Sequence, residues 1–406
     1  MKEKKIKRNS IQLVYDWVLI LVAVILTGNP LGSMFYSQLT IVFFVLILIN
    51  IFFRINVKFN LKIFIYIAVL CCLSIFSALV NLDTDFTHYI GIIFSHVAVL
   101  FGVALIDYRT FRSIYTRIVI IIALYSSIIT LYLNLIDINL LFSFPEISGW
   151  RTIAFIYNAW GTNSWTTTVR NSGFFREPGV MAMHVCIAGI LLLGKIKNHS
   201  SFAKRDWMSF IVLIIAGVLT LSTVGVLGAF LLVILFFAKL DHLKKIDFII
   251  LVCFFIVALI ILASNFDVLF SKFNSNHSSF ISLTDRVSGI LSALNVALKN
   301  PIFGAGYTVY HNLASSVVTF YFVDLWGKYG IFYPLIVTFG IYSFVKSETN
   351  RIIERLVVVL ILAFFLISQG FADNPIFIFI ELYGISKSKK EQIKINYDVY
   401  DYRSKL

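Results

Sequence analysis

Residues 63–81 read IFIYIAVLCCLSIFSALVN, a stretch of nineteen residues without a charged side chain. An α-helix needs about 20 apolar residues to cross the hydrocarbon core of a bilayer, so this stretch has the length and character of a membrane span. Polar clusters separate it from eleven further apolar runs. The twelve candidate spans cover residues 13–29, 36–53, 63–81, 89–106, 117–136, 178–194, 208–222, 223–239, 247–264, 329–346, 356–371 and 374–386. The sequence therefore predicts an all-α polytopic membrane protein with about 12 transmembrane helices.

The amino-acid composition also indicates a membrane protein. Hydrophobic residues make up 59% of the 406 residues and charged residues 14%, whereas soluble domains have roughly 45–50% apolar and about 25% charged residues. Residues 1–8 form a basic flank like that of a signal peptide, but no cleavage site follows residues 27–30, so we expect a retained first helix. No linker or repeat interrupts the chain, which predicts a single transmembrane domain over residues 1–406.

The positive charges predict the orientation of the spans. The net charge is +13, and if both termini are cytoplasmic, 27 of the 34 lysines and arginines lie on the cytoplasmic side, including those of a tail over residues 387–406. The positive-inside rule favours this topology over its inverse. Because the charge follows the topology, it does not indicate binding to nucleic acid.

Two connections on the outer side, residues 137–177 and 265–328, are much longer than the others. Loops longer than about 12–15 residues are usually functional or disordered, and the aromatic content of the first argues against disorder. In the second, we expect an amphipathic helix that is capped by Thr284 or Asp285 and stops before Asn300–Pro301. Its apolar face comprises Val287, Ile290, Leu291, Leu294 and Leu298.

The strongest local motif is RNSGFFREPG at residues 170–179, where the first long loop meets the sixth span. Pro178 suits the first turn of a helix, and Glu177 would then lie beside the free amide groups and positive dipole of that turn. One interpretation makes Glu177 a helix cap and the two arginines interfacial anchors. The same grouping also suits an anionic partner, since arginine binds phosphate in a planar, bidentate manner.

Two further motifs lie later in the chain. Residues 219–225, LTLSTVG, separate two short spans, which predicts a tight outer hairpin, broken helices lining a cavity, or simple packing through small residues. Asp285–Arg286 is followed by NPIFGAGY at residues 300–307 and by His311–Asn312. These glycines follow no predicted strand, which excludes a dinucleotide fingerprint, and a lone histidine is more often structural than catalytic. The histidines and the four cysteines show no metal-ligand spacing.

At these motifs the chain resembles a known family. The run at residues 170–179 is similar to the Arg–Ser–Gly–Phe–x–x–Glu–Pro segment of Wzy-type O-antigen and capsule repeat-unit polymerases. The Leu-Ser turn, the glycines of residues 300–307 and His311–Asn312 occur in the same order in the wider O-antigen polymerase and ligase superfamily. The resemblance covers about residues 150–345. It implies a GT-C-like fold with two large extracytoplasmic segments, located in a bacterial inner membrane.

The resemblance also implies that the chain polymerises oligosaccharide repeat units carried on undecaprenyl pyrophosphate. Negative charge develops on the departing pyrophosphate and cations stabilise it, so with arginines present we expect no metal ion or other cofactor. The expected pyrophosphate-binding residues are Arg170, Arg176 and Arg286, with Arg151 as a weaker member. Glu177 is the first candidate for the base that takes the acceptor proton, and His311 is the second. The expected substrate-binding residues are Trp160, Trp165, Ser222, Tyr307 and Asn312.

Two other functions are alternatives to polymerisation. An O-antigen ligase shares the donor and the fold, but a glycine at a fixed distance after the histidine is expected there, and Gly327 and Gly330 do not follow His311 at such a spacing. A lipid-linked oligosaccharide flippase would carry charges inside its spans and short outer loops, which is the reverse of the pattern found here. The expected partners are the bilayer, the lipid-linked oligosaccharides and a chain-length regulator.

Overall fold

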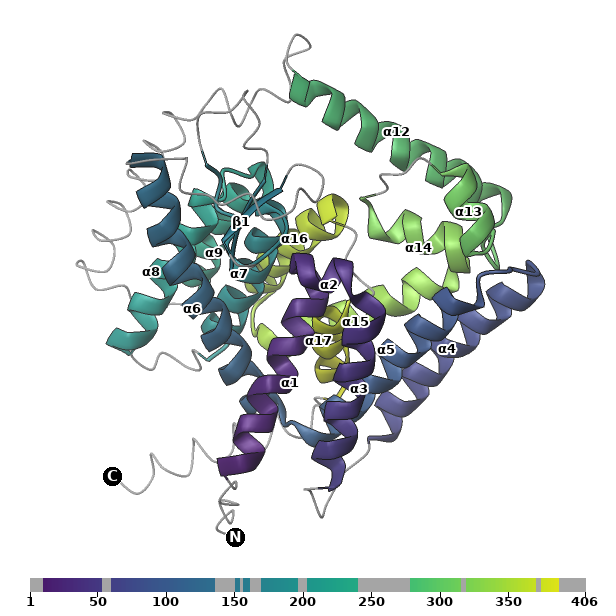
Figure 1. The fold of residues 1–406 in the computed structure, drawn as a ribbon, viewed down its shortest axis with the longest axis horizontal. Coiled ribbons are helices and arrows are strands. Elements are labelled where there is room, and N and C mark those ends of the chain that lie inside the picture. Colours follow the sequence, from purple (N-terminus) through teal and green to yellow (C-terminus); the bar gives the residue numbers. More distant parts are fainter. Residues whose placement is uncertain are drawn as a thin grey trace.

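The computed structural model describes residues 10–52, 60–135, 150–153, 156–160, 169–195, 203–239, 278–314, 319–369 and 374–386. Within these residues it contains fifteen helices and one two-stranded antiparallel sheet (Figure 1). The long helices are α1 (Ser10–Gly28), α3 (Tyr36–Phe52), α4 (Leu61–Val80), α5 (Phe86–Leu105), α6 (Tyr108–Leu135), α7 (Pro178–Leu193), α8 (Lys204–Leu219), α9 (Thr223–Lys239), α12 (Ser278–Lys299), α15 (Phe332–Glu348), α16 (Ile352–Gln369) and α17 (Pro375–Ser386). The short elements are α2 (Pro30–Met34), β1 (Trp150–Ile153), β2 (Tyr157–Trp160), α13 (Tyr307–Leu313) and α14 (Tyr321–Tyr329).

Four of the described helices, α1, α4, α5 and α6, are long and apolar enough to cross a membrane. Four further apolar helices, α3, α7, α9 and α17, are shorter. Helices cover eleven of the twelve ranges predicted as spans, while the range 247–264 lies outside the described residues. The described structure therefore agrees with the predicted class, an all-α membrane protein.

Helix α7 forms the centre of the bundle. Every residue from Pro178 to Leu193 is buried, and α7 packs against α6, α8, α9 and α16. Its sequence is apolar on all sides, which is the pattern of a helix that is surrounded by other helices. Gly189 allows close contact with α9, since a Cβ at this position would lie 2.6 Å from a methyl carbon of Leu232. The start of α7 is consequently fixed in the middle of one end of the bundle.

The helix connections gather at two ends of the bundle. At the first end, which we call the loop end, α1 finishes beside the start of α7, and the amide of Arg176 donates to the carbonyl of Gly28 at 2.8 Å. At the opposite end, which we call the basic end, α9 finishes at Lys239 and α15 at Glu348. Figure 1 shows β1 and α12 near the loop end, at the top of the view, and the start of α1 near the bottom.

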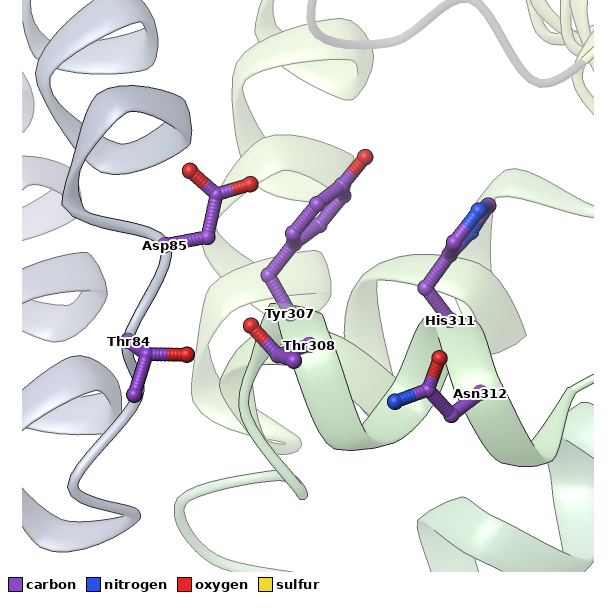
Figure 2. A pocket seen from close by; sticks show the side chains of 6 residues that line it. All are labelled: Thr84, Asp85, Tyr307, Thr308, His311 and Asn312. Carbon is purple, nitrogen blue, oxygen red and sulfur yellow. The ribbon is translucent and has the colours of Figure 1, made fainter.

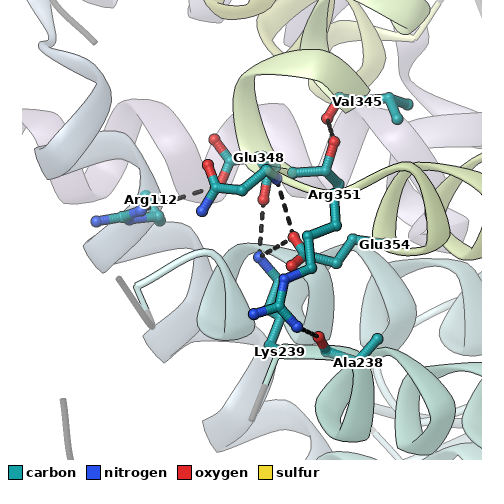
Figure 3. Close-up of polar contacts among 9 residues, drawn as sticks. Arg112, Ala238, Lys239, Val345, Glu348, Arg351 and Glu354 are labelled. Atoms are coloured by element: carbon teal, nitrogen blue, oxygen red, sulfur yellow. Dashed lines mark hydrogen bonds and ion pairs between the residues drawn. The ribbon is translucent and has the colours of Figure 1, made fainter. Parts of the chain in front are cut away.

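A buried ionic network joins four helices at the basic end (Figure 3). The Lys239 Nζ donates to the carbonyl oxygen of Glu348 at 2.8 Å and lies 3.5 Å from Glu354 Oε2. The side chains of Lys239 and Glu354 are only 3% and 4% exposed. Arg112 approaches the carboxylate of Glu348 at 3.9 Å. Because the charges are paired where water is excluded, they fix α6, α9, α15 and α16 relative to one another.

The first long loop contains a β-hairpin that the sequence did not predict. Strands β1 and β2 pair in antiparallel register, with Trp150 opposite Trp160 and Ile153 opposite Tyr157. The hairpin is attached to α6, because the hydroxyl of Tyr125 donates to the carbonyl of Ile156 at 2.7 Å. A second contact joins the hydroxyl of Tyr157 to a threonine hydroxyl of α6 at 2.8 Å. The hairpin thereby extends the loop end of the bundle.

The predicted amphipathic helix is α12, and the structure corrects two details of the prediction. The helix begins at Ser278, so Thr284 and Asp285 lie inside the helix and neither is its cap. Several serines precede Thr284 and serine is a strong capping residue, so the sequence alone did not single out the true start. The predicted stop before Asn300–Pro301 is confirmed.

The predicted apolar face of α12 is largely exposed, with Val287, Leu291 and Leu298 at 50%, 60% and 61%. The helix instead packs through small residues, and Ala293 belongs to a buried cluster with Val323 of α14. Small side chains allow two helix backbones to approach closely, which is a common basis for helix packing in membrane proteins. Leucine spacing therefore identified the helix but not its buried face.

Candidate functional site

The segment at residues 169–177 is held in place by elements from three parts of the chain. The amide of Asn171 donates to the carbonyl of Leu219 at the end of α8, at 3.0 Å. The carbonyl of Phe174 accepts from the side-chain amides of Asn29 at 2.5 Å and of Asn158 at 3.1 Å. These contacts fix the motif at the start of α7, at the loop end of the bundle. The predicted motif is thus an ordered element between α1, α8 and the hairpin.

Glu177 occupies the N-cap position of α7, and Pro178 is the first residue of the helix, as predicted. The Glu177 side chain makes no capping hydrogen bond. Its Oε1 instead lies 4.0 Å from the Nε of Arg176, and the two side chains are 32% and 31% exposed. The carboxylate is therefore not used as a simple cap, and solvent or a ligand can reach it. The positive end of the α7 dipole adds to the local preference for an anion.

Arg170 is half-buried beside the turn between α8 and α9, where its Nε donates to the carbonyl of Thr220 at 3.3 Å. Burial lowers the pKa of its guanidinium to about 10; the nearby charge of Glu177 opposes this shift and the charge of Arg286 adds to it. Arg170, Arg176, Glu177 and Arg286 thus form one group, which we call the arginine site. Three guanidinium groups against one carboxylate leave a net positive charge that suits an anionic ligand.

Two polar side chains next to Arg170 have unmet hydrogen-bonding capacity. Asn171 and Ser172 are both 0% exposed. Within the described part of the chain, neither the side-chain amide of Asn171 nor the hydroxyl of Ser172 has a hydrogen-bond partner. An unsatisfied buried polar group costs about 1–3 kcal/mol, and its retention calls for a specific reason. The sequence motif contained both residues, but nothing in it indicated this burial.

The second motif forms a tight hairpin rather than a pair of broken helices. Helix α8 ends at Leu219 and α9 begins at Thr223, and Leu221 adopts a φ of 45° that non-glycine residues rarely have. Thr220 stabilises the turn, since its hydroxyl donates to the carbonyl of Gly217 at 2.7 Å. Thr220 also supplies the carbonyl that contacts Arg170. Ser222 lies beside this contact, and its substrate-binding role stays a prediction.

The remaining candidates gather at a different place, around α13. An open pocket of ≈ 330 Å³ contains three predicted residues together with three that the sequence reasoning missed (Figure 2). The pocket, which we call the α13 pocket, is lined by Thr84, Asp85, Tyr307, Thr308, His311 and Asn312. The rings of Tyr307 and His311 stand parallel with their centroids 5.8 Å apart. The structure therefore separates His311 from the arginine site.

A buried carboxylate attaches α13 to the connection between α4 and α5. Asp83 is 5% exposed and accepts hydrogen bonds from the hydroxyl of Tyr89 at 2.8 Å and from the amide and hydroxyl of Thr308. Burial by itself raises the pKa of Asp83, but these hydrogen bonds and one from the amide of Asp85 outweigh it and lower the pKa to about 2. Asp83 is thus ionised at neutral pH and fixes Thr84 and Asp85 against α13.

The glycines of residues 300–307 have a structural explanation. Gly304 has a φ of 70°, and a Cβ there would lie 2.5 Å from the backbone of Lys328. Gly306 has a φ of 76°, and a Cβ there would lie 2.8 Å from the carboxylate of Asp83. Side chains are excluded at both positions by conformation and by space. The motif therefore shapes the turn that leads into α13.

Three predicted site residues lie where no side chain is described. Arg151 is on strand β1 and Trp160 on strand β2, and for these two residues the structure describes the backbone pairing only. Trp165 lies outside the described residues. Across the described ranges, no group of three or more histidine, cysteine, aspartate and glutamate side chains could hold a metal ion.

Two carboxylates in the short connection NLDTDFTH, residues 81–88, were the signal that could have directed attention to the α13 pocket. Comparison with known proteins gives no further assignment, because no family model and no curated protein matches the chain.

Proposed function

We propose that this chain is a glycan polymerase that joins oligosaccharide repeat units carried on undecaprenyl pyrophosphate, at the outer face of a bacterial inner membrane. The observation that carries the proposal is the arginine site at the start of the buried helix α7, where Arg176 lies 4.0 Å from Glu177 and the charges of Glu177 and Arg286 both act on Arg170. Such an excess of guanidinium groups suits a pyrophosphate. The sequence resemblance supplies the identity of the lipid and of the glycan.

The proposed reaction is a displacement at the anomeric carbon of the donor glycan. The bond from this carbon to the pyrophosphate oxygen breaks, and the bonding electron pair leaves with the lipid pyrophosphate. A hydroxyl oxygen of the next repeat unit forms the new glycosidic bond and gives its proton to a base. The guanidinium groups stabilise the charge that grows on the leaving group, so they lower the barrier more than they strengthen substrate binding.

Glu177 is the better placed of the two candidate bases. A base must lie about 2.6–3.2 Å from the hydroxyl whose proton it takes, and the reacting carbon is attached to the pyrophosphate. Arg286 and Lys299 are thirteen positions apart on α12, which corresponds to roughly 20 Å along a helix. His311 is on α13, which packs against the second half of α12, whereas Glu177 is adjacent to Arg176. We therefore keep Glu177 as the proposed base.

The proposed topology has about 12 spans in a GT-C-like arrangement, with both termini cytoplasmic and the loop end outside. After the four native cysteines are replaced by alanine, we expect a cysteine at Ile156 or Leu82 to react with a membrane-impermeant maleimide in intact spheroplasts. Both positions are at the loop end, with exposures of 55% and 85%. A cysteine at the exposed Arg205, at the start of α8, is expected to react only after lysis. The reverse labelling pattern would show that the topology is inverted.

Deleting the gene in a Gram-negative host is expected to leave lipopolysaccharide that carries a single repeat unit. A cell without its polymerase can still transfer one unit to the lipid A core, so a gel would show one capped band instead of a ladder. Unsubstituted core with polymer retained on the carrier would indicate a ligase. Unsubstituted core with single units confined to the inner leaflet would indicate a flippase.

Adding a chelator to the purified protein tests whether polymerisation needs a divalent metal ion. If the arginine site supplies the positive charge, polymerisation should continue without a divalent metal ion. Loss of activity in chelator that magnesium or manganese restores would contradict a mechanism based on arginines alone.

A further inference from the structure

We propose that the α13 pocket binds a neutral, hydroxyl-rich sugar ring of the repeat unit, and that Asp85 accepts hydrogen bonds from its hydroxyl groups. This inference rests on the proposed function, and it assigns a role to the α4–α5 connection that the family resemblance does not imply. The pocket volume of ≈ 330 Å³ is at the lower end of the range for small-molecule sites, about 300–1,000 Å³. It fits a small polar group rather than a lipid chain.

Asp85 has an acceptor oxygen available to a ligand. Its Oδ1 accepts from the hydroxyl of Thr87 at 2.5 Å and from the amide of His88 at 3.2 Å. Its Oδ2 accepts no hydrogen bond from any residue within the described ranges, and the side chain is half-buried at the pocket wall. The hydrogen bond from Thr87 is the main cause that lowers the pKa of Asp85. The carboxylate is therefore charged at neutral pH and can accept from two neighbouring hydroxyls.

The other lining groups match a sugar better than they match a phosphate. Figure 2 shows Thr84 and Asp85 on one side of the pocket and the side chains of α13 on the other. A hydroxyl group both donates and accepts, so a lining of carboxylate, amide, imidazole and hydroxyls can satisfy several of them. A phosphate would be repelled by Asp85 and Asp83. Lys328 does not reverse this charge, because it is paired with Asp324 at 2.6 Å.

The pocket walls are preorganised for binding. Asp83 joins the α4–α5 connection to α13 through Thr308. The ring of Tyr307 stacks on His88 with a centroid distance of 3.5 Å, and His88 in turn contacts the hydroxyl of Tyr329 at 2.8 Å. A site whose walls are already fixed loses little conformational entropy when a ligand binds. This rigidity separates the pocket from an ordinary group of solvated surface side chains.

The separation of the two sites defines what the pocket contributes. Tyr310 of α13 clusters with Ala293 and Val296 of α12, which follow Arg286 by roughly 10–15 Å along the helix. A sugar in the α13 pocket is therefore remote from the reacting carbon at the arginine site. Binding energy from remote parts of a substrate can be used to position its reacting part. The α13 pocket would accordingly select the repeat unit by a sugar ring that does not itself react.

The test measures binding and does not require catalysis. The repeat-unit oligosaccharide of the host is released from its lipid by mild acid, which removes the pyrophosphate, and is offered to the full-length protein in nanodiscs. Saturation-transfer NMR should detect binding to the wild type, and Asp85→Asn should weaken it by about tenfold, since a charged acceptor becomes neutral. Asp107→Asn is the matched control, because Asp107 also accepts from an amide three residues on and from a threonine hydroxyl, at the start of α6.

Each outcome bears on the proposal. Equal binding to the wild type and Asp85→Asn, or no binding to a wild type with a normal elution profile, would overturn it. Binding that is lost in Arg170→Lys but kept in Asp85→Asn would place the sugar at the arginine site instead. If Asp85→Asn alone weakens binding but the wild type fails to polymerise lipid-linked units, the pocket assignment holds and the proposed function fails.

Discussion

The Arg170→Lys variant is expected to lose polymer formation by about 10²-fold or more, although it keeps the positive charge. Lysine presents a single ammonium group and cannot reproduce two parallel hydrogen bonds to a phosphate. It also cannot replace the Nε contact to the carbonyl of Thr220 that orients Arg170. The measurement is the polymer ladder in a deletion strain that expresses each variant at equal abundance.

Other arginines provide graded comparisons for Arg170. Arg176→Lys should also lose most activity, because Arg176 belongs to the same site, whereas Arg151→Lys should matter less. Arg205→Lys is the matched control, since Arg205 is exposed at the start of α8. Wild-type ladders from Arg170→Ala and Arg176→Ala proteins of normal abundance would mean that these arginines are interfacial anchors.

The arginine site could be predicted largely from the sequence because most of it is local. Arg170, Arg176 and Glu177 lie within eight residues, and Pro178 marks the first turn of the following helix through a rule of backbone geometry. Apolar runs predicted the helices for a similar reason, since the hydrophobicity of each run can be read from consecutive residues. Arg286 was included only because an arginine suits a phosphate. The sequence could not show that α12 brings it near Arg170.

The α13 pocket could not be predicted, because its partners are distant in sequence. Asp83 and Thr308 are separated by 225 positions, and Tyr89 and Tyr307 by 218. A single sequence carries no direct information on which distant segments meet. His311 was consequently considered alone, with a structural role as the simpler interpretation. In the structure, the ring of His311 is parallel to that of Tyr307, and the α4–α5 connection forms the opposite wall of the pocket.

The second long loop contributes residues to both sites, which fits a single substrate path. Arg286 is on α12 and Tyr307 begins α13, so the second long loop contributes to both. The arginine site is positively charged, while Asp85 makes the α13 pocket negative. This difference fits the two parts of a lipid-linked oligosaccharide, an anionic pyrophosphate and a neutral glycan.

The Lys239→Ala variant is expected to lose about 3–5 kcal/mol of stability, because it breaks a buried charge pair. Lys239 has a 3% exposed side chain and contacts both Glu354 and the carbonyl of Glu348. Without it, the carboxylate of Glu354 stays buried and keeps the hydrogen bond that it accepts from the amide of Asn350. The midpoint of thermal unfolding in detergent, followed by the monodisperse fraction on size-exclusion chromatography, should fall by several degrees.

The double variant Lys239→Met with Glu354→Gln tests the cause of this loss. It removes both charges, keeps an oxygen that can accept from Asn350, and fills the site with a side chain of similar length, so much of the stability should return. Lys204→Ala, at the exposed start of α8, should leave the midpoint unchanged. If Lys239→Ala unfolds at the wild-type temperature, or if the double variant is the less stable one, the ionic network does not hold the basic end together.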